Sequence, residues 1–145
     1  MIKLKTVDES NFEAVLDLSL SPQDHRRVAS NTYSLAQAWL YGEKVKPYAI
    51  YNSDQVVGFL MLWIYPEKNE WLIWRLMIDR HHQNQGYGKE VLRQVIKLAQ
   101  ADQVCQRLIA DYVIGNHRMR GMLESLAFET KGPVGNEVVM ELKIK

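Results

Sequence analysis

The chain has 145 residues, of which 47% are hydrophobic and 24% are charged, and its formal net charge is +1. This length and composition indicate one globular domain spanning residues 1–145 and exclude a mainly disordered chain. The near-neutral charge provides no basic field for a nucleic-acid backbone, and the longest apolar stretch, residues 56–65, is too short for a membrane span of roughly 20 residues.

The cysteine content and the first residues indicate a cellular setting. Cys105 is the single cysteine, so no internal disulfide can form. Residues 1–5 lack the apolar core of a signal peptide. We therefore expect a reducing, cytoplasmic environment with no nucleic-acid or membrane partner. Cys105 itself is expected to be a buried and unreactive thiol, because no histidine or basic cluster lies near it in the sequence.

The N-terminal part of the sequence predicts a strand followed by a short helix. Ile2, Leu4 and Thr6 alternate with Lys3, Lys5 and Val7, which indicates a strand with one buried face. Ser10 and Glu13 have the spacing of a capping box, in which each side chain accepts a backbone N–H at the start of a helix. This pattern predicts a helix that ends at about Leu18.

Two further helical segments are expected before the first hairpin. Ser21 and Pro22 indicate a helix start, because the missing N–H of proline costs nothing at the first helical position. Residues 34–37 indicate another turn or helix. Gly42 is placed to end it, because glycine adopts a left-handed backbone conformation cheaply.

The remaining sequence predicts mainly strands, interrupted by two helices. In chain order the predicted elements are strands at 48–52, 55–65 and 70–79, a helix after residue 88, a strand at 107–114, a helix to about 126, and strands at 128–130 and 137–144. Residues 52–54 and 66–69 form predicted turns, and residues 132–136 link the last two strands. The order of elements predicts an α/β (α+β) domain with a mixed sheet and helices on both faces.

A glycine loop between a predicted strand and an amphipathic helix is the most informative feature. Gln83, Asn84, Gln85, Gly86, Tyr87, Gly88 and Lys89 form this loop and the start of the helix. Glycines let a ligand approach the backbone closely, and the free N–H groups at a helix N-terminus attract phosphate or pyrophosphate. No G-x-x-x-x-G-K-[ST] pattern and no G-x-G-x-x-G on a first βα unit occur, so an NTPase P-loop and a dinucleotide fold are not supported.

The loop also carries a family resemblance. Gln83, Gly86 and Gly88 match the pattern Q/R-x-x-G-x-G/A of the GNAT acyltransferase superfamily, and the sequence resembles this family over its whole length. A second block, from Asn116 to Phe128, is similar to the family pattern N-x-x-A-x-x-x-Y-x-x-x-G-F. Residues 75–79 (R-L-M-I-D) and 57–61 (V-G-F-L-M) most resemble bacterial spermine/spermidine acetyltransferases.

The resemblance implies a fold and a set of ligand contacts. It implies a mostly antiparallel sheet of about seven strands, split between strands four and five, with about four helices. It also implies that acetyl-CoA is the co-substrate, with its pyrophosphate on the backbone of residues 83–89 and its pantetheine arm along Leu76, Met77 and Ile78. A backbone N–H near Met77 or Ile78 would stabilise the oxyanion, and Asn116 would contact the pantetheine arm as well as cap its helix.

The sequence departs from the family pattern where proton-transfer residues are expected. Trp74 occupies the position of an acidic residue in the related polyamine enzymes, and Leu123 occupies that of the tyrosine acid. Ala127 replaces a glycine. Three explanations remain open: positioning and the oxyanion hole suffice, other residues act instead, or the domain binds acyl-CoA without efficient turnover. The other residues within plausible reach are Asp111, Tyr112 and Glu70.

The histidines and the aromatic residues are weaker indications of a metal site and of an acceptor pocket. His81 and His82 do not have the spacing of a zinc site, so we expect them in solvent and expect no metal. Seven aromatic residues form either core and dimer-interface packing or an acceptor pocket; these are Tyr33, Trp39, Tyr41, Trp63, Tyr65, Trp71 and Trp74.

Together these observations predict an acetyl-CoA-dependent N-acetyltransferase. The acceptor is a primary amine of a small molecule, with a polyamine as one candidate, and it attacks the thioester directly in a ternary complex. The alternatives are an acyl-CoA-binding regulatory or interaction module with weak or no catalysis, and a protein N-acetyltransferase. The resemblance also implies a homodimer.

Overall fold

A single sheet of seven strands organises the molecule in the computed structural model, which describes residues 1–20 and 29–145. The strand order is β1-β2-β3-β4-β5-β7-β6, and every neighbouring pair is antiparallel except β4–β5. The bounds are β1 Ile2–Thr6, β2 Val45–Asn52, β3 Gln55–Tyr65, β4 Glu70–Ile78, β5 Arg107–Val113, β6 Glu129–Val134 and β7 Glu137–Lys143. The predicted mixed, mostly antiparallel sheet is confirmed.

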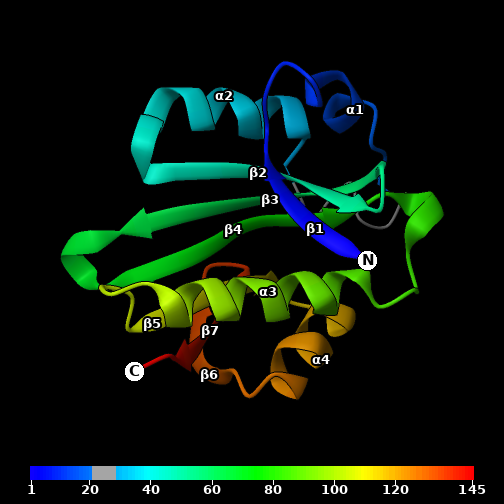
Figure 1. Ribbon diagram of the computed structural model, residues 1–145. Helices are drawn as coiled ribbons and strands as arrows, with labels where there is room; N and C mark the ends of the chain where they lie inside the picture. The colour runs from blue at the N-terminus through cyan, green and yellow to red at the C-terminus, as the bar shows by residue number, and fades with distance from the viewer. Residues whose placement is uncertain (21–28) are drawn as a thin grey trace.

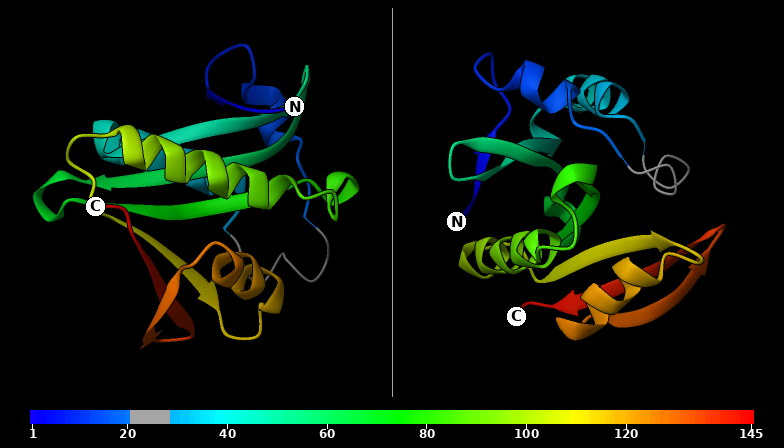
Figure 2. Two further views of the ribbon diagram at one scale, coloured as in Figure 1. Left: turned by 60° about the horizontal axis from the view of Figure 1, so that its bottom comes forward. Right: turned by 90° about the vertical axis from the view of Figure 1, so that its right-hand side faces the viewer.

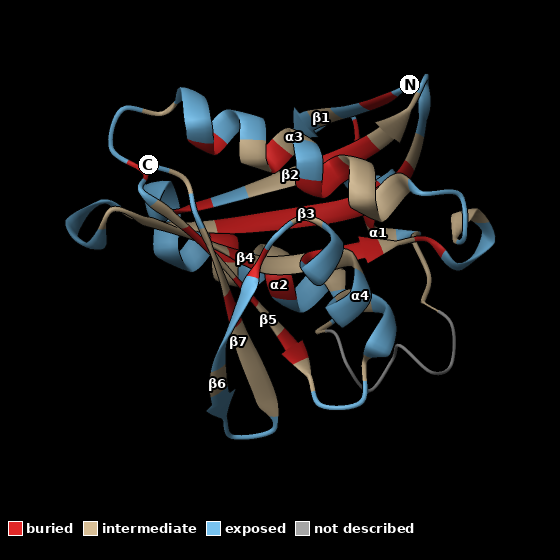
Figure 3. Cartoon of the chain, turned by 90° about the horizontal axis from the view of Figure 1, so that it is seen from below, coloured by how far each residue is buried: buried red, intermediate tan, exposed pale blue. Residues whose placement is uncertain are grey.

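Helices cover both faces of this sheet, as predicted (Figure 1). Within the described residues the α-helices are α1 Phe12–Leu16, α2 Asn31–Tyr41, α3 Tyr87–Ala101 and α4 His117–Ser125. α1 and α2 lie over one face, with a core that includes Phe59, Met61 and Met77. α3 and α4 lie on the opposite side, over a larger core that includes Leu92 and Leu123. β3 is buried along most of its length because it lies between these two cores (Figure 3).

The predicted capping box at Ser10 is wrong. The Ser10 hydroxyl and N–H both donate to the carboxylate of Asp8, which forms a local turn instead. Asn11 takes the N-cap position without a side-chain hydrogen bond to α1, since its amide group bonds the backbone of Asp8 and Thr6. α1 therefore spans one short turn and ends before the predicted boundary at Leu18.

The second helix of the described chain begins earlier than its predicted start. The Ser30 hydroxyl accepts the N–H of Tyr33, so Ser30 is the N-cap and α2 begins at Asn31. Ser34 is instead buried within the helix and donates its hydroxyl to the Ser30 carbonyl. Gly42 ends α2 with φ of +59°, as predicted. The predicted helix start at Ser21 and Pro22 lies outside the described residues.

Most of the later elements are confirmed, and the closing pair is longer than predicted. β2 extends back to Val45, Asn116 caps α4 by accepting the Met119 N–H, and a tight turn follows β3. β6 continues through Gly132 and Pro133 to Val134, with an irregular register between Thr130 and Gly132. The predicted linker at 132–136 is therefore reduced to a two-residue turn, because a bulge lets the strand continue past the glycine.

The pairing of β3 with β4 contains two features that shape the functional site. Gly58 lies opposite Ile78, and a Cβ on Gly58 would stand 2.5 Å from the Met77 carbonyl oxygen, so only glycine permits this close approach. Further along, Met61 pairs with Arg75 while Leu62 pairs with Ile73. Trp74 is therefore the extra residue of a β-bulge, which turns Trp74 and Arg75 toward the α2 face together.

The sheet splits between β4 and β5, as the resemblance implied. The parallel pairing covers only Glu70–Ile73 against Arg107–Ala110. Beyond this point the two strands diverge, and the C-terminal half of the sheet, with β5, β7 and β6, turns away from β1–β4 (Figure 2). The edge of β4 that would otherwise pair with β5 is thus open from Trp74 onward.

Candidate active site

The first cavity lies beside the glycine loop, between the end of β4 and the starts of α3 and α4. It has a volume of about 340 Å³. Its lining residues are Leu20, Leu76, Met77, Ile78, His82, Gln83, Asn84, Gly86, Tyr87, Gly88, Lys89, Asn116, Arg118, Met119 and Met122. The structure thus brings together every residue predicted to contact acetyl-CoA except Gln85. Gln85 is exposed, and its side-chain oxygen accepts from the Tyr87 hydroxyl.

The loop presents backbone N–H groups to this cavity. Gly86 occupies the N-cap of α3 with φ of +79°, and no side chain caps the helix. The N–H groups of the first helical turn have no intrahelical partners, and the helix dipole gives them a positive partial charge. A Cβ on Gly86 would meet nothing within 4 Å, so the space beside this backbone is open. The loop is therefore suited to an anionic group such as a pyrophosphate.

Several side chains hold the loop in place. The Gln83 amide donates to the Ile78 carbonyl at 3.1 Å, and its oxygen accepts from the Arg118 guanidinium at 3.2 Å. Gln83 thus connects β4 to the first turn of α4. Gly88 lies where α3 faces α4, since a Cβ there would be in ordinary van der Waals contact with the Met122 sulfur at 3.4 Å.

Asp79 is a buried anchor directly before the loop. Its carboxylate accepts the N–H of Ser19 at 2.8 Å, the N–H of His81 at 3.2 Å, and lies 3.2 Å from His82 Nδ1. Burial by itself would raise the pKa of Asp79, but these hydrogen bonds lower it overall. His81 is exposed as expected, whereas His82 is half-buried and lines the cavity. The prediction that His82 lies in solvent is therefore wrong, because its contact with Asp79 keeps the ring at the cavity wall.

A second cavity of about 320 Å³ occupies the point where β4 and β5 diverge. Its lining residues are Ala29, Leu72, Ile73, Trp74, Arg75, Leu76, Asp111, Tyr112, Val113, Asn116, Met119 and Glu137. Leu76, Asn116 and Met119 also line the first cavity. The two cavities therefore adjoin beside Leu76, toward the C-terminal end of β4, so molecules held in the two cavities can come together there.

Asp111 is a titratable residue of the second cavity with a partly buried carboxylate. Its Oδ1 atom is buried and has no hydrogen-bond partner among the described residues. Burial raises the pKa of the Asp111 carboxyl, and the nearby negative charge of Glu137 raises it further. A carboxylate whose pKa is raised is a stronger proton acceptor than an ordinary surface carboxylate. Asp111 can therefore act as a general base in this cavity.

The other two candidates for proton transfer lie in different surroundings. Tyr112 also lines the second cavity, but it is only 9% exposed and belongs to the main core under α3 and α4. Glu70 lies at the opposite end of β4 and lines neither cavity. Its carboxylate accepts from Arg107 Nε at 3.2 Å, which joins β4 to β5.

The three residues that depart from the family pattern have different surroundings in the structure. Trp74 lines the second cavity. Leu123 is completely buried in the main core and is not among the lining residues of either cavity. Ala127 has φ of +72°, a left-handed conformation that suits the glycine of the family pattern better than alanine.

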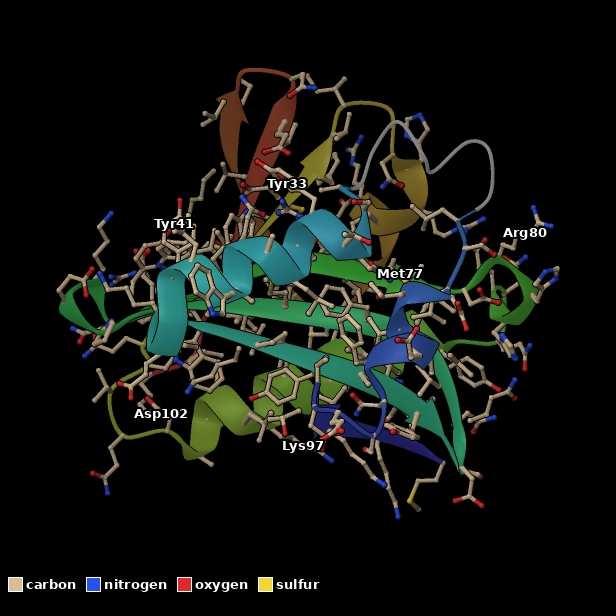
Figure 4. All side chains as sticks on the ribbon, turned by 90° about the horizontal axis from the view of Figure 1, so that it is seen from above. Tyr33, Tyr41, Met77, Arg80, Lys97 and Asp102 are labelled. Carbon is tan, nitrogen blue, oxygen red and sulfur yellow. The ribbon has the colours of Figure 1, made fainter. Side chains whose placement is uncertain are left out.

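The predicted aromatic set divides into three groups. Tyr41, Trp63, Tyr65 and Trp74 form one cluster, with ring centroids 4.6 Å apart for Tyr41 and Trp63 and 5.0 Å for Trp63 and Trp74. Trp71 packs on the other face of the sheet, against the main core. Tyr33 and Trp39 are exposed. Tyr33 and Tyr41 lie at opposite ends of α2 (Figure 4). Of the seven, only Trp74 lines one of the two cavities.

Sequence reasoning missed four polar residues that line the cavities: Arg75, Glu137, His82 and Arg118. Arg75 lies within a motif that carried the family resemblance, but nothing in that motif placed its side chain in a cavity. Glu137 is the first residue of the last strand and has no local signal, since only the pairing of β7 with β5 brings it there.

No group of three His, Cys, Asp or Glu side chains within residues 1–20 and 29–145 could hold a metal ion. None of the helices in this part of the chain combines the length and the apolar character needed to cross a membrane.

Comparisons with known proteins agree with this geometry. The family model described as Acetyltransferase (GNAT) family matches residues 12–128. The chain is 28% identical over 138 residues to the spermine/spermidine N(1)-acetyltransferase of Bacillus subtilis (strain 168), which covers 90% of each sequence.

Solved structures share the fold. The spermidine N-acetyltransferase of Vibrio cholerae, in complex with CoA and spermine, superposes with a TM-score of 0.78 at 10% identity, covering 98% of this chain and 95% of that one. The ribosomal-protein-S18-alanine N-acetyltransferase of Escherichia coli has a TM-score of 0.76 at 17% identity, covering 100% and 95%.

Proposed function

The chain belongs to the acetyltransferase (GNAT) family, and we propose that it transfers the acetyl group of acetyl-CoA to a primary amine of a small molecule by direct attack in a ternary complex. The observation that carries this proposal is the meeting of the two cavities at Leu76, Asn116 and Met119. One cavity is built around a glycine loop suited to an anion, and the other contains a carboxylate suited to accept a proton.

The first cavity would hold acetyl-CoA, which supplies the activated acetyl group. The loop backbone around Gly86 and the first turn of α3 would bind the pyrophosphate, with Lys89 and Arg118 adding positive charge nearby. The open edge of β4 at Leu76–Ile78 can pair with an extended pantetheine arm. A backbone N–H near Met77 or Ile78 would then stabilise the thioester oxyanion, and such a donor contributes about 3–4 kcal/mol in comparable reactions.

Asp111 would prepare the acceptor for attack. An alkylammonium must lose a proton before its nitrogen can form a bond to the carbonyl carbon. In this proposal the Asp111 carboxylate accepts that proton, and the neutral nitrogen forms the new C–N bond. The C–S bond then breaks to release the CoA thiolate, and the nitrogen loses its second proton to solvent as the amide forms. The thiolate is then protonated from solvent, so no side chain is needed at the position of Leu123.

A polyamine is one candidate acceptor. The similar Bacillus subtilis protein is named for spermine and spermidine, and Asp111 and Glu137 place two carboxylates in the acceptor cavity. The aromatic face of Trp74 in the same cavity can also attract a cation. Either a monoamine or a longer polyamine satisfies these features.

The test measures CoA-thiol release from acetyl-CoA with a panel of polyamines, amino acids, other small amines and lysine peptides. We expect saturable, amine-dependent release. Asp111→Asn should lower kcat by about 10²–10⁴-fold, the range for a general base. Asp54→Asn, at an exposed turn outside both cavities, is the matched control and should leave the rate unchanged.

Other outcomes would redirect the assignment. Acetyl-CoA binding without release for any acceptor would favour an acyl-CoA-binding regulatory module. Release with lysine peptides alone would favour a protein N-acetyltransferase. Wild-type rates in Asp111→Asn would remove Asp111 from the mechanism and leave positioning as the source of catalysis.

We also propose a cellular location and an oligomeric state for the protein. We expect residues 1–145 to function as one acetyltransferase domain in the cytoplasm, as a homodimer, without a metal, nucleic-acid or membrane partner. The homodimer rests on the family resemblance and the cytoplasmic setting on the single cysteine. Sedimentation equilibrium of the purified protein, with and without acetyl-CoA, measures the oligomeric state directly.

A further inference from the structure

Arg75 places a positive charge without an ion-pair partner among the described residues beside the acceptor cavity. Its Nη2 donates to the Gln37 side chain at 2.9 Å and its Nη1 to the Trp74 carbonyl at 3.2 Å. The guanidinium carbon lies 4.8 Å from the centroid of the Trp74 ring. All three contacts are with uncharged groups, and Arg75 forms no ion pair with any described residue. The Nε atom is buried and has no hydrogen-bond partner in the described chain.

Such a charge is costly to keep inside a protein. Burial lowers the pKa of Arg75, whereas the fields of Tyr33 and Glu137 act in the opposite direction. A guanidinium nevertheless stays protonated in proteins, so it remains a cation at the wall of the cavity. A half-buried cation without a carboxylate partner destabilises the fold unless a ligand supplies the anion. Its place in a cavity therefore indicates a binding role.

The carboxylates of the same cavity lie on the opposite branch of the split sheet. Asp111 is on β5 and Glu137 is on β7, which pairs with β5, while Arg75 is on β4. The cavity thus has a cationic wall on β4 and an anionic wall on β5 and β7. A ligand that fits both walls has a positive end and a negative end.

We propose that the amine acceptor also carries a carboxylate or a similar anionic group, which Arg75 binds while Asp111 and Glu137 face the amino group. This inference rests on the proposed acetyl transfer and narrows its acceptor to zwitterionic amines such as amino acids. A polyamine lacks the anion and brings further positive charges toward an existing guanidinium, which is unfavourable. The planar guanidinium matches a carboxylate through two parallel hydrogen bonds.

The test compares matched acceptors that differ only by the carboxylate. These pairs are lysine with cadaverine, ornithine with putrescine, and phenylalanine with phenethylamine. For at least one pair we expect kcat/KM to be about 10- to 100-fold higher for the amino acid, which is the typical contribution of a hydrogen bond to a charged group. In Arg75→Met this ratio should fall to about one, mainly through the loss of activity toward the amino acid.

The ratio within one variant does not depend on the fraction of folded protein, so a partly unfolded Arg75→Met preparation still gives an answer. Arg75→Lys retains the charge and should retain part of the preference. Arg93→Met, at an exposed position on α3 away from both cavities, is the control and should retain all of it.

The outcomes separate this inference from the proposed function. If every diamine or arylalkylamine is acetylated as efficiently as its amino acid, the inference is wrong although acetyl transfer stands. An unchanged preference in Arg75→Met also refutes it. If no amine of either kind releases CoA, the proposed acetyl transfer fails, and the inference fails with it.

Discussion

Gly58→Ala tests how closely the packing of β3 on β4 controls the first cavity, the proposed acetyl-CoA site. The new Cβ would lie 2.5 Å from the Met77 carbonyl oxygen, 2.9 Å from Ile78 Cδ1 and 3.0 Å from Ile50 Cδ1. Ordinary contact begins at 3.4 Å. The Met77 carbonyl, which belongs to the backbone and cannot rotate away, must therefore move by about 0.9 Å relative to Gly58. This movement displaces the part of β4 that lines the first cavity.

The expected cost follows from that displacement. Overpacking of a tight core contact costs about 1–3 kcal/mol, which corresponds to a fall in Tm of about 3–10 °C in a domain of this size. A misplacement of about 1 Å in a reacting geometry lowers rates by about 10²-fold. We therefore expect Gly58→Ala to unfold at lower temperature, to bind acetyl-CoA more weakly and to release CoA more slowly.

The assays are thermal unfolding followed by circular dichroism and acetyl-CoA titration by calorimetry. Gly121→Ala in α4 is the matched control, because a Cβ there meets nothing within 4 Å and alanine favours a helix. This variant should be as stable as the parent or slightly more so. If Gly58→Ala has the Tm and acetyl-CoA affinity of the parent, then the close approach of β3 to β4 does not determine the cavity, and the reasoning fails.

Two further predictions concern stability. Folding raises the pKa of Asp111 above its ordinary value of 3.8. The folded state therefore binds this proton more tightly than the unfolded state does. As a result, the free energy of unfolding falls as the pH rises from near 4 through the raised pKa. Asp111→Asn should therefore have a higher Tm than the parent at pH 7, with a difference that shrinks as the pH is lowered toward 4; a constant difference would show that the charge is not its cause. Ala127→Gly should relieve the left-handed strain at φ of +72° and raise the free energy of unfolding by up to about 1 kcal/mol in a denaturant titration, whereas a destabilised variant would show that alanine is tolerated without strain.

Local patterns determined most of the elements and the anion-binding loop. The hairpin around residues 52–55, the amphipathic helix α3 and the Asn116 cap depend on a few adjacent residues, so their side-chain types sufficed to predict them. The loop at Gly86 is of the same kind, because a left-handed glycine and a free helix N-terminus are neighbours in sequence. The family pattern added the split of the sheet, which no local feature indicates.

Local reasoning failed where residues compete for the same partner or where a bulge changes the face of a strand. Asp8 takes the Ser10 hydroxyl that the capping box required, and the spacing from Ser10 to Glu13 contains no information about that competition. The bulge at Trp74 turns Trp74 and Arg75 toward the same face, whereas simple alternation would place them on opposite faces.

The set of side chains that line the second cavity was decided by the tertiary structure alone. Glu70 and Asp111 were equal candidates in the sequence, yet Glu70 pairs with Arg107 where β4 and β5 are still joined, and Asp111 lies where they have separated. Glu137 reaches the cavity only because β7 pairs with β5. Sequence determines which side chains exist and which local turns they favour. The surroundings of a side chain depend instead on strand register and on elements far away in the chain. Those surroundings raise the pKa of Asp111 and leave Arg75 without an ion pair among the described residues.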